Sequence, residues 1–134
     1  SRTPLHLACI SGHADVVQFL VEKKCKIDHC DKFNQSPLMK AVEHQHGDCT
    51  AILLDHGANH DLRGASGNTA LHFAVMGSSK SLVELSLEHG ADIDAKNEFG
   101  YTLLILAITE KRKEMVKFLL QKRADVNAQD NPSR

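Results

Sequence analysis

The chain has 134 residues and a formal net charge of −1, and 42% of its residues are hydrophobic. This length accommodates one domain with a core of its own, and the near-neutral charge disfavours nucleic acid or an anionic membrane as the partner. The sequence contains neither an apolar run near the roughly 18 residues of a membrane helix nor a signal-peptide pattern at its start.

A short motif recurs along the chain with a period of 33 residues. Its copies are Thr3–Ala8, Ser36–Ala41, Thr69–Ala74 and Thr102–Ala107, with Leu at the third position and Ala at the sixth position of each. A period between about 20 and 50 residues predicts a solenoid, in which each unit is too short to bury its apolar face alone and therefore stacks on its neighbours.

In chain order, each unit is expected to contain two helices. The first helices are predicted at residues 4–11, 37–44, 70–77 and 103–110, and the second helices at residues 15–23, 48–56, 81–89 and 114–122. The Thr or Ser that opens each motif can cap the first helix, and Pro follows it in two copies. Loops built on β-turns are predicted at residues 28–35, 61–68 and 94–101.

The ends of the second helices differ between units. Gly57 and Gly90 stand where a left-handed residue commonly terminates a helix, whereas Lys24 and Arg123 occupy the same position in the first and last units. A side chain in the left-handed conformation costs on the order of 1 kcal/mol. We therefore expect the second helices of the outer units to have the weaker ends.

Apolar side chains of neighbouring units are expected to meet. The predicted contact between the first two units joins Leu5, Ala8, Phe19 and Leu20 to Leu38, Ala41, Ile52 and Leu53.

The motif, its spacing and its number resemble the ankyrin-repeat family. The resemblance implies an all-α solenoid of stacked helix–turn–helix units with β-turn loops, as a single domain over residues 1–134 with repeats at about 1–32, 33–65, 66–98 and 99–131. The sequences of Glu22–Lys26 and Ser36–Ala41 also resemble those of the testis-type, POTE-like group of ankyrin-repeat proteins. Because the chain opens within a repeat, we expect it to be a piece of a longer protein.

His6 and His72 occupy the fourth position of the motif, where Met39 and Ile105 stand in the other two copies. Either histidine could serve catalysis, but a residue that recurs with the repeat is typical of a structural role. We therefore expect each imidazole to bond the Thr of its own motif and the nearby backbone.

Two segments rich in His and Cys raise the possibility of zinc, residues 25–30 and residues 44–49. In register with the repeat, Cys25 and Cys49 fall at buried positions, whereas His29, Cys30 and His44 fall on a loop or a helix rim. The ligands would point in different directions, unlike the tight tetrahedron that structural zinc requires. We expect no metal and four reduced cysteines, in a protein of the cytoplasm or the nucleus.

Catalytic and nucleotide-binding patterns are lacking in the sequence. No nucleophile, base and orienting group are spaced as a set, and Gly64 and Gly67 belong to a turn rather than to a phosphate-binding loop. The basic run 111–113 is flanked by Glu110 and Glu114, which is typical of a solvated helix turn. We expect neither enzyme activity nor a cofactor.

The resemblance implies a partner-binding concave face that is built from loop tips and the exposed rim of the first helices. The candidate residues on that face are Phe33, Gln35, Glu43, His44, Arg63, Asn68, Met76, Lys96, Phe99, Tyr101 and Glu110. Apolar and aromatic side chains at exposed positions are typical of protein-binding sites. Alternatively, the Phe rings fold down and cover the turns beneath them.

The sequence thus indicates a non-catalytic scaffold or adaptor module that binds a partner protein or peptide and is a monomer in isolation. The alternative is a structural spacer or self-association unit that packs through its repeat ends. If the first hypothesis holds, the loop tips are essential for binding the partner, whereas the second hypothesis predicts that mutations in the loop tips have no effect on function.

Overall fold

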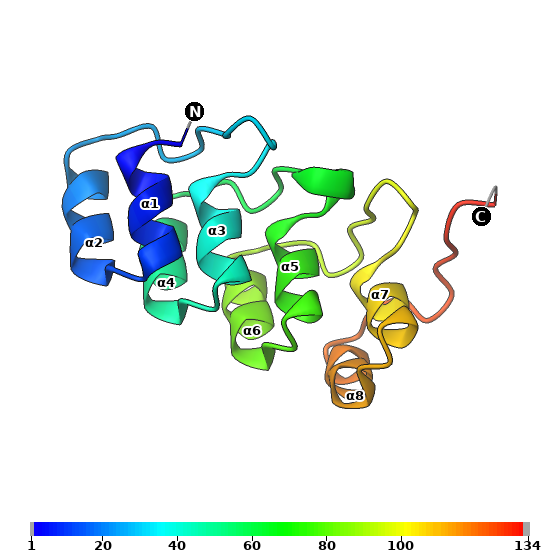
Figure 1. The fold of residues 1–134 in the computed structure, drawn as a ribbon. Coiled ribbons are helices and arrows are strands. Elements are labelled where there is room, and N and C mark those ends of the chain that lie inside the picture. The colour runs from blue at the N-terminus through cyan, green and yellow to red at the C-terminus, as the bar shows by residue number, and fades with distance from the viewer. Residues whose placement is uncertain (1, 133–134) are drawn as a thin grey trace.

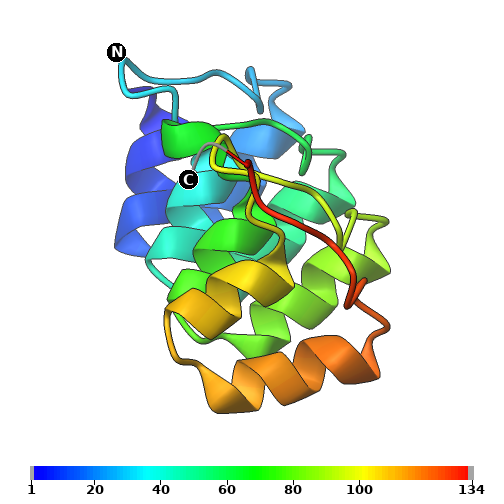
Figure 2. The ribbon, with the colours of Figure 1, turned by 90° about the vertical axis from the view of Figure 1, so that its right-hand side faces the viewer.

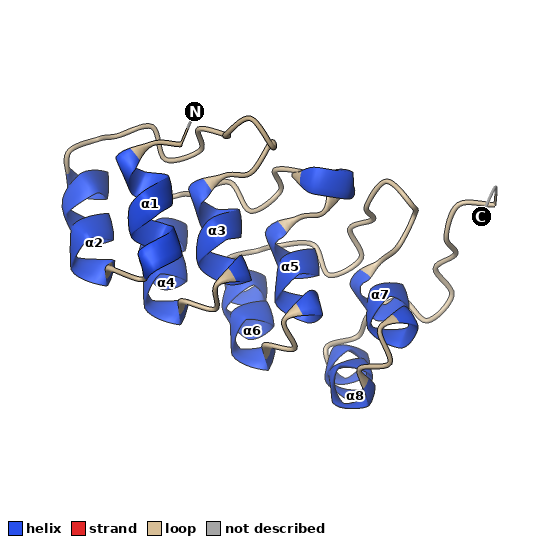
Figure 3. Ribbon diagram, in the orientation of Figure 1, coloured by secondary structure: helices blue, strands red, loops and turns tan. Residues whose placement is uncertain are grey.

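A computed structural model describes residues 2–132; the ends of the predicted domain, at residue 1 and residues 133–134, lie outside the described residues. Within residues 2–132 the secondary structure is helical, with eight α-helices, one 3-10 turn and no strand (Figure 3). This confirms the predicted all-α architecture.

The helices form four consecutive pairs, as the period predicts. The first helices are α1 (Pro4–Ser11), α3 (Pro37–Glu43), α5 (Ala70–Met76) and α7 (Leu103–Thr109). The second helices are α2 (Ala14–Glu22), α4 (Gly47–Asp55), α6 (Lys80–Glu88) and α8 (Lys113–Gln121). Most bounds lie one residue earlier than predicted. The reason is a left-handed residue in each inter-helix turn, such as Gly12 or Lys111, after which a single residue, such as His13 or Arg112, precedes the next helix.

The hydroxyl of the motif caps three of the first helices, α1, α3 and α7. Ser36 accepts from the main-chain N–H of Met39 at 3.3 Å, and Thr102 accepts from that of Ile105 at 3.3 Å. Thr3 accepts from His6 in the same way. These bonds satisfy N–H groups that a helix start otherwise leaves without a partner.

The first helices form one row and the second helices form a parallel row behind it (Figure 1). The loops run across one end of both rows, from each second helix to the following first helix (Figure 2). A 3-10 turn, η1 (Ala65–Gly67), lies in the middle loop.

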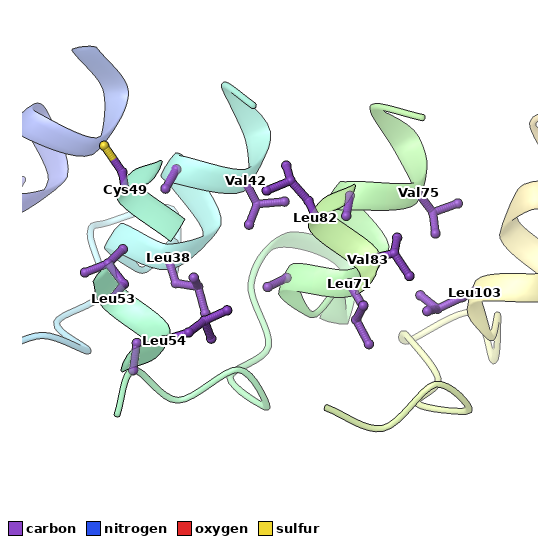
Figure 4. Packing of buried hydrophobic residues seen from close by; sticks show 14 of the residues in the cluster. Leu38, Val42, Cys49, Leu53, Leu54, Leu71, Val75, Leu82, Val83 and Leu103 are labelled. Carbon is purple, nitrogen blue, oxygen red and sulfur yellow. The ribbon is translucent and has the colours of Figure 1, made fainter. Parts of the chain in front are cut away.

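The core runs between the rows through all four pairs. Leu38, Leu53, Leu71 and Leu103 are almost completely buried and line it from one unit to the next (Figure 4). The predicted contribution of Phe19 is wrong: this ring is 66% exposed. Phe19 lies on the side of the first pair that faces away from the second pair, where the described residues form no other helix pair.

The ends of the second helices adopt the predicted conformation. Gly57 and Gly90 have φ of 84° and 89°, and Lys24 and Arg123 are left-handed as well, with φ of 60° and 69°. None of the helices within residues 2–132 has the length and apolar character needed to cross a bilayer.

Candidate partner-binding surface

The motif histidines hold the loops onto the helices. His72 Nδ1 accepts from the main-chain N–H of Thr69 at 3.2 Å, and its Nε2 donates to the carbonyl of Tyr101 in the next loop at 2.9 Å. His6 makes the equivalent bond to the carbonyl of Gln35 at 2.9 Å. Both imidazoles are fully buried, which confirms the structural role predicted for them. Burial lowers the pKa of His72, although its bond to Tyr101 opposes that shift.

The outer two of the three loops between units end in turns that a side chain closes. Asp31 Oδ1 accepts from the main-chain N–H groups of Phe33 and Gln35, both at 2.9 Å. Asn97 does the same for Phe99 and Tyr101 at 3.0 Å. Burial on its own raises the pKa of the Asp31 carboxyl, but these N–H bonds, with Lys40 and His6 nearby, bring it below its usual value.

The middle loop is built differently because Gly64 stands at the position of Asp31 and Asn97. Without a side-chain acceptor, the turn tightens into η1, with Ser66 left-handed at φ 58°. A Cβ on Gly64 would clash with Oε1 of Gln35, which occupies that space. Gln35 is therefore buried, with 7% of its surface exposed.

Hydrogen bonds join each loop to the next. Asn34 donates to the carbonyl of Arg63 at 2.9 Å, and the Arg63 guanidinium donates to the carbonyl of Lys96. Asn97 donates to the side chain of Asn68 at 2.9 Å. These contacts tie the loop tips into one connected edge, so the position of each tip depends on its neighbours.

The eleven candidate residues fall into two groups. Seven lie on the loops: Phe33, Gln35, Arg63, Asn68, Lys96, Phe99 and Tyr101. Four lie where the first helices end: Glu43, His44, Met76 and Glu110. A seven-residue helix is about 10 Å long, so a partner that contacts both groups must lie along the first-helix row.

The loop group is not uniformly exposed. Phe33, Arg63 and Lys96 are exposed, Asn68, Phe99 and Tyr101 are half-buried, and Gln35 is buried. The Phe33 ring is 60% exposed, with the Lys32 ammonium 5.2 Å from its centre. The rings of Phe99 and Tyr101 lie 5.8 Å apart, in the tilted geometry of an aromatic pair.

The helix-end group is polar except for Met76. Glu43 lies 3.2 Å from the Lys40 ammonium and 3.9 Å from His44, whose ring stacks on that of His46 at 6.3 Å between ring centres. The half-buried Met76 is at the end of α5, and Glu110 is exposed at the end of α7. This group offers a partner carboxylates and an imidazole beside one flexible apolar side chain.

Two asparagines take part in this edge that the sequence analysis did not identify. Asn34 is left-handed at φ 63° and bridges to Arg63, and Asn131 donates to the carbonyl of Glu98 at 2.8 Å. The left-handed conformation of Asn34 could have been predicted from its position in a turn, because Asn is enriched among left-handed residues. The partner of Asn131 depends on the spacing between loops, which the sequence pattern does not report.

The cysteine-rich region is a packing feature. Burial raises the pKa of Cys9 to about 12 and that of Cys49 to about 11. Cys25 and Cys30 are half-buried, and all four thiols are free. Among the residues that the structure describes, no three His, Cys, Asp or Glu side chains lie where they could together hold a metal ion.

Stacked helix pairs joined by hydrogen-bonded loops define an α-helical repeat solenoid. A family model described as ankyrin repeats, in three copies, matches residues 1–64 and again residues 57–130. The chain therefore belongs to the ankyrin-repeat family.

The chain is also similar to parts of several curated proteins. It is 41% identical over 73 residues to the B-cell lymphoma 3 protein homolog of Mus musculus, which covers 54% of this chain and 16% of that protein. It is 36% identical over 61 residues to serine/threonine-protein kinase 12 of Arabidopsis thaliana, covering 46% and 13%. It is 72% identical over 25 residues to ankyrin repeat domain-containing protein 7 of Homo sapiens, covering 19% and 10%. The aligned regions make up between 2% and 16% of the length of such relatives.

Proposed function

We propose that this chain is a non-catalytic interaction module, part of a scaffold or adaptor, which binds a partner protein or peptide along the loop tips and the first-helix row. Ankyrin repeats are in general protein–protein interaction modules. The observation that carries the proposal here is Phe33, a ring 60% exposed at a loop tip. Exposed aromatic rings are common anchors of protein interfaces.

The loop bonding supports this proposal through the entropy of binding. Asp31 and Asn97 fix two turns, and Asn34 and Arg63 bridge neighbouring loops. A surface that is ordered before a partner arrives loses less conformational entropy on docking. Phe99 and Tyr101 are half-buried and expose only part of their rings to a partner, whereas most of the Phe33 ring is exposed.

The experiment compares two exposed phenylalanines. Phe33→Ser removes the ring from a loop tip, and Phe19→Ser removes a ring of similar exposure, 66%, from the outer side of the first pair. Proteins captured from a cell lysate are quantified for both variants, and each candidate is then purified and its binding to the chain measured directly. The proposal requires a 1:1 partner whose affinity falls at least about tenfold with Phe33→Ser only. Equal loss with Phe19→Ser, or no loss with either, would refute it.

The second candidate is a structural spacer or self-association unit that packs through its ends. The observation in its favour is the exposure of Leu7 and Phe19 at one end and of Ile108 and Leu120 at the other. This function predicts concentration-dependent oligomers and indifference to Phe33→Ser. Sedimentation across a range of concentrations separates it from the binding module, for which we propose a monomer.

Several finer assignments accompany the proposal. We infer that the four helix pairs are four repeats, at about 1–32, 33–65, 66–98 and 99–131, in a single domain that belongs to a longer protein of the POTE-like group. We also infer a cytoplasmic or nuclear location, no catalytic activity or cofactor in the whole protein, and no binding to nucleic acid or membrane. One relative is named a serine/threonine-protein kinase, so activity of flanking domains is testable only in the full-length protein.

A further inference from the structure

An apolar groove with a basic rim lies on the outer side of the last helix pair. It measures about 510 Å³ and runs between α7 and α8, whose outer sides face the viewer in Figure 2. Ala107, Ile108 and Val116 form its apolar part. Its rim consists of Lys111, Arg112, Lys113 and Lys117, and none of the described residues that line it is acidic.

The apolar part of the groove corresponds to an inter-unit contact elsewhere in the chain. Ile108 is 57% exposed, whereas Val75 and Val42, one and two periods earlier, are 0% and 1% exposed. Val116 is half-buried, whereas Val83 at the equivalent position is completely buried. Inside the stack, helices of the following pair cover these positions, and Figure 4 shows Val42 and Leu82 of α6 pointing toward one another. A helix therefore has the shape that fits this groove.

The rim differs from every internal junction in its charge. The four rim positions hold other residues in each earlier unit. One period earlier they are Ser78, Ser79, Lys80 and Glu84; two periods earlier, Gln45, His46, Gly47 and Ala51; and three periods earlier, Gly12, His13, Ala14 and Gln18. Those sets are close to neutral, whereas the rim of the groove carries four cations. Glu114 lies 3.7 Å from Lys117, but both side chains are about 70% exposed, so this pair is weak. The groove thus favours an occupant with negative charge.

The same register disfavours a second copy of the chain as the occupant. At the last internal junction, Lys122, the residue that follows α8, donates to Glu84 of α6 at 2.6 Å. If a copy stacked in the same way on the outer side, the equivalent residues would be Lys23 of that copy and Lys117. Two like charges would then replace an ion pair, which opposes such an assembly.

We propose that the groove between α7 and α8 binds an amphipathic helix of a partner protein, whose apolar stripe contacts Ile108 and Val116 and whose flanking Asp and Glu residues pair with Lys111, Lys113 and Lys117. The side chain of Arg112 is held in place at the rim because its guanidinium donates to the carbonyl of Met76 at 2.9 Å. This surface is separate from the loop tips that carry the proposed function.

The probe is a synthetic helical peptide of about 18 residues with a Leu stripe flanked by Glu, and its counterpart has Lys in place of every Glu. Binding to the 134-residue chain is measured by fluorescence anisotropy at low and physiological salt. We expect 1:1 binding of the acidic peptide, weakened by salt, and at least tenfold weaker binding of the basic peptide.

Variants locate the binding. The triple change Lys111→Glu, Lys113→Glu and Lys117→Glu should weaken the acidic peptide at least about tenfold, and Ile108→Ser about fivefold through the lost apolar contact. The matched control reverses three exposed lysines at the other end of the chain, Lys23, Lys24 and Lys26, and should change binding less than about twofold.

Other outcomes overturn the proposal. The proposal is wrong if the acidic peptide does not bind, if both peptides bind equally, or if the control triple weakens binding as much as the rim triple. Binding that Ile108→Ser leaves unchanged would also contradict it, because it would indicate only diffuse charge attraction. A dimer that Ile108→Ser dissociates would identify a second copy as the occupant. Phe33→Ser should leave peptide binding unchanged, so this test fails or succeeds independently of the proposed function.

Discussion

The imidazole of His72 donates to the main-chain carbonyl of Tyr101 at 2.9 Å and so joins α5 to the loop of the next unit. That carbonyl also accepts from the main-chain N–H of Asn97 at 3.0 Å. Because the carbonyl keeps one partner, replacing His72 does not leave it wholly unsatisfied. The second unit has Met39 at this position, so a methionine fits the local backbone.

From this geometry, His72→Met should lower the free energy of unfolding by about 1–3 kcal/mol, since it removes bonds made by a buried imidazole. Urea denaturation followed by circular dichroism measures the change. Met39→Leu serves as the control, because it replaces one apolar side chain with another of similar volume at the same register, and its cost should be below about 1.5 kcal/mol. Equal losses in the two variants would show that the imidazole contributes only its volume.

A pH dependence follows from the lowered pKa of His72, whose first cause is burial. Below the ordinary His value of about 6.5, the unfolded chain binds a proton that the folded chain excludes. Stability should therefore fall as the pH decreases from about 7 to 5, and His72→Met should remove part of that slope. Denaturation at several pH values checks this, and an unchanged slope in the variant would assign the dependence to other groups.

His89 should act in the opposite direction. Its imidazole bonds the carbonyl of Leu85 at 3.0 Å and Asp55 of α4 at 2.9 Å, and both contacts raise its pKa. The stabilisation from this proton is complete below about 6.5 and is lost as the pH rises through the raised folded value. Asp55→Asn should reduce stability at pH 5.5 more than at pH 8.5. NMR titration of the His89 ring in both proteins gives the pKa directly, and an unshifted value would contradict this account.

Much of the fold follows from the period of 33 residues, which places Leu38 and Leu71 in one register and so predicts the core and the helix order. The outer side of the first unit was harder to predict. Phe19 has the pattern of a core residue, yet it is exposed because burial at that position requires a neighbouring pair. The burial of Gln35 likewise depends on the space left by Gly64, 29 residues away.

The candidate surface was predicted only by position. Repeat register assigns Phe33 and Phe99 to equivalent loop tips, but the first ring is exposed and the second is half-buried beside Tyr101. The basic groove was not predicted. Because Glu110 and Glu114 flank Lys111–Lys113 in the sequence, this segment has the pattern of a solvated turn. Only folding places these cations around Ile108.

Left-handed residues at two helix ends offer a route to higher stability. Lys24 and Arg123 stand where Gly57 and Gly90 terminate the inner second helices, and both side chains are exposed. Replacing either with Gly should therefore raise the free energy of unfolding by up to about 1 kcal/mol, since Gly has no Cβ to strain this conformation.

The reverse substitution provides the comparison. Gly57→Lys should destabilise the chain by a similar amount, because a Cβ there meets no heavy atom within 4 Å and the effect is confined to the backbone. Thermal and chemical denaturation of the three variants should give opposite signs for the two directions. A loss of stability in both Lys24→Gly and Arg123→Gly would show that the extra chain entropy of unfolded Gly outweighs the strain.

The four thiols should divide into two classes by reactivity. Burial raises the pKa of Cys9 to about 12, so roughly one molecule in ten thousand carries its thiolate at pH 8. Cys49 is equally inaccessible at 0% exposure. Cys25 and Cys30 are half-buried outside helices, and the Cys30 thiol makes only a weak 3.6 Å contact with the carbonyl of Asp28. With a disulfide reagent at pH 8, we expect Cys25 and Cys30 to react quickly, with Cys30 the slower of the two because burial raises its pKa. We expect Cys9 and Cys49 to react only as fast as the chain opens.

A double variant, Cys25→Ser with Cys30→Ser, isolates the slow class and should show no fast phase in the native protein. Urea should then accelerate the remaining reaction, because Cys9 and Cys49 lie between the first two helix pairs and become accessible only when those pairs separate. Fast reaction of the double variant without urea would mean that the first pair opens readily, so that its exposed outer side weakens the contact on its inner side as well. The reaction rate of Cys9 and Cys49 thus measures how firmly the second pair holds the first.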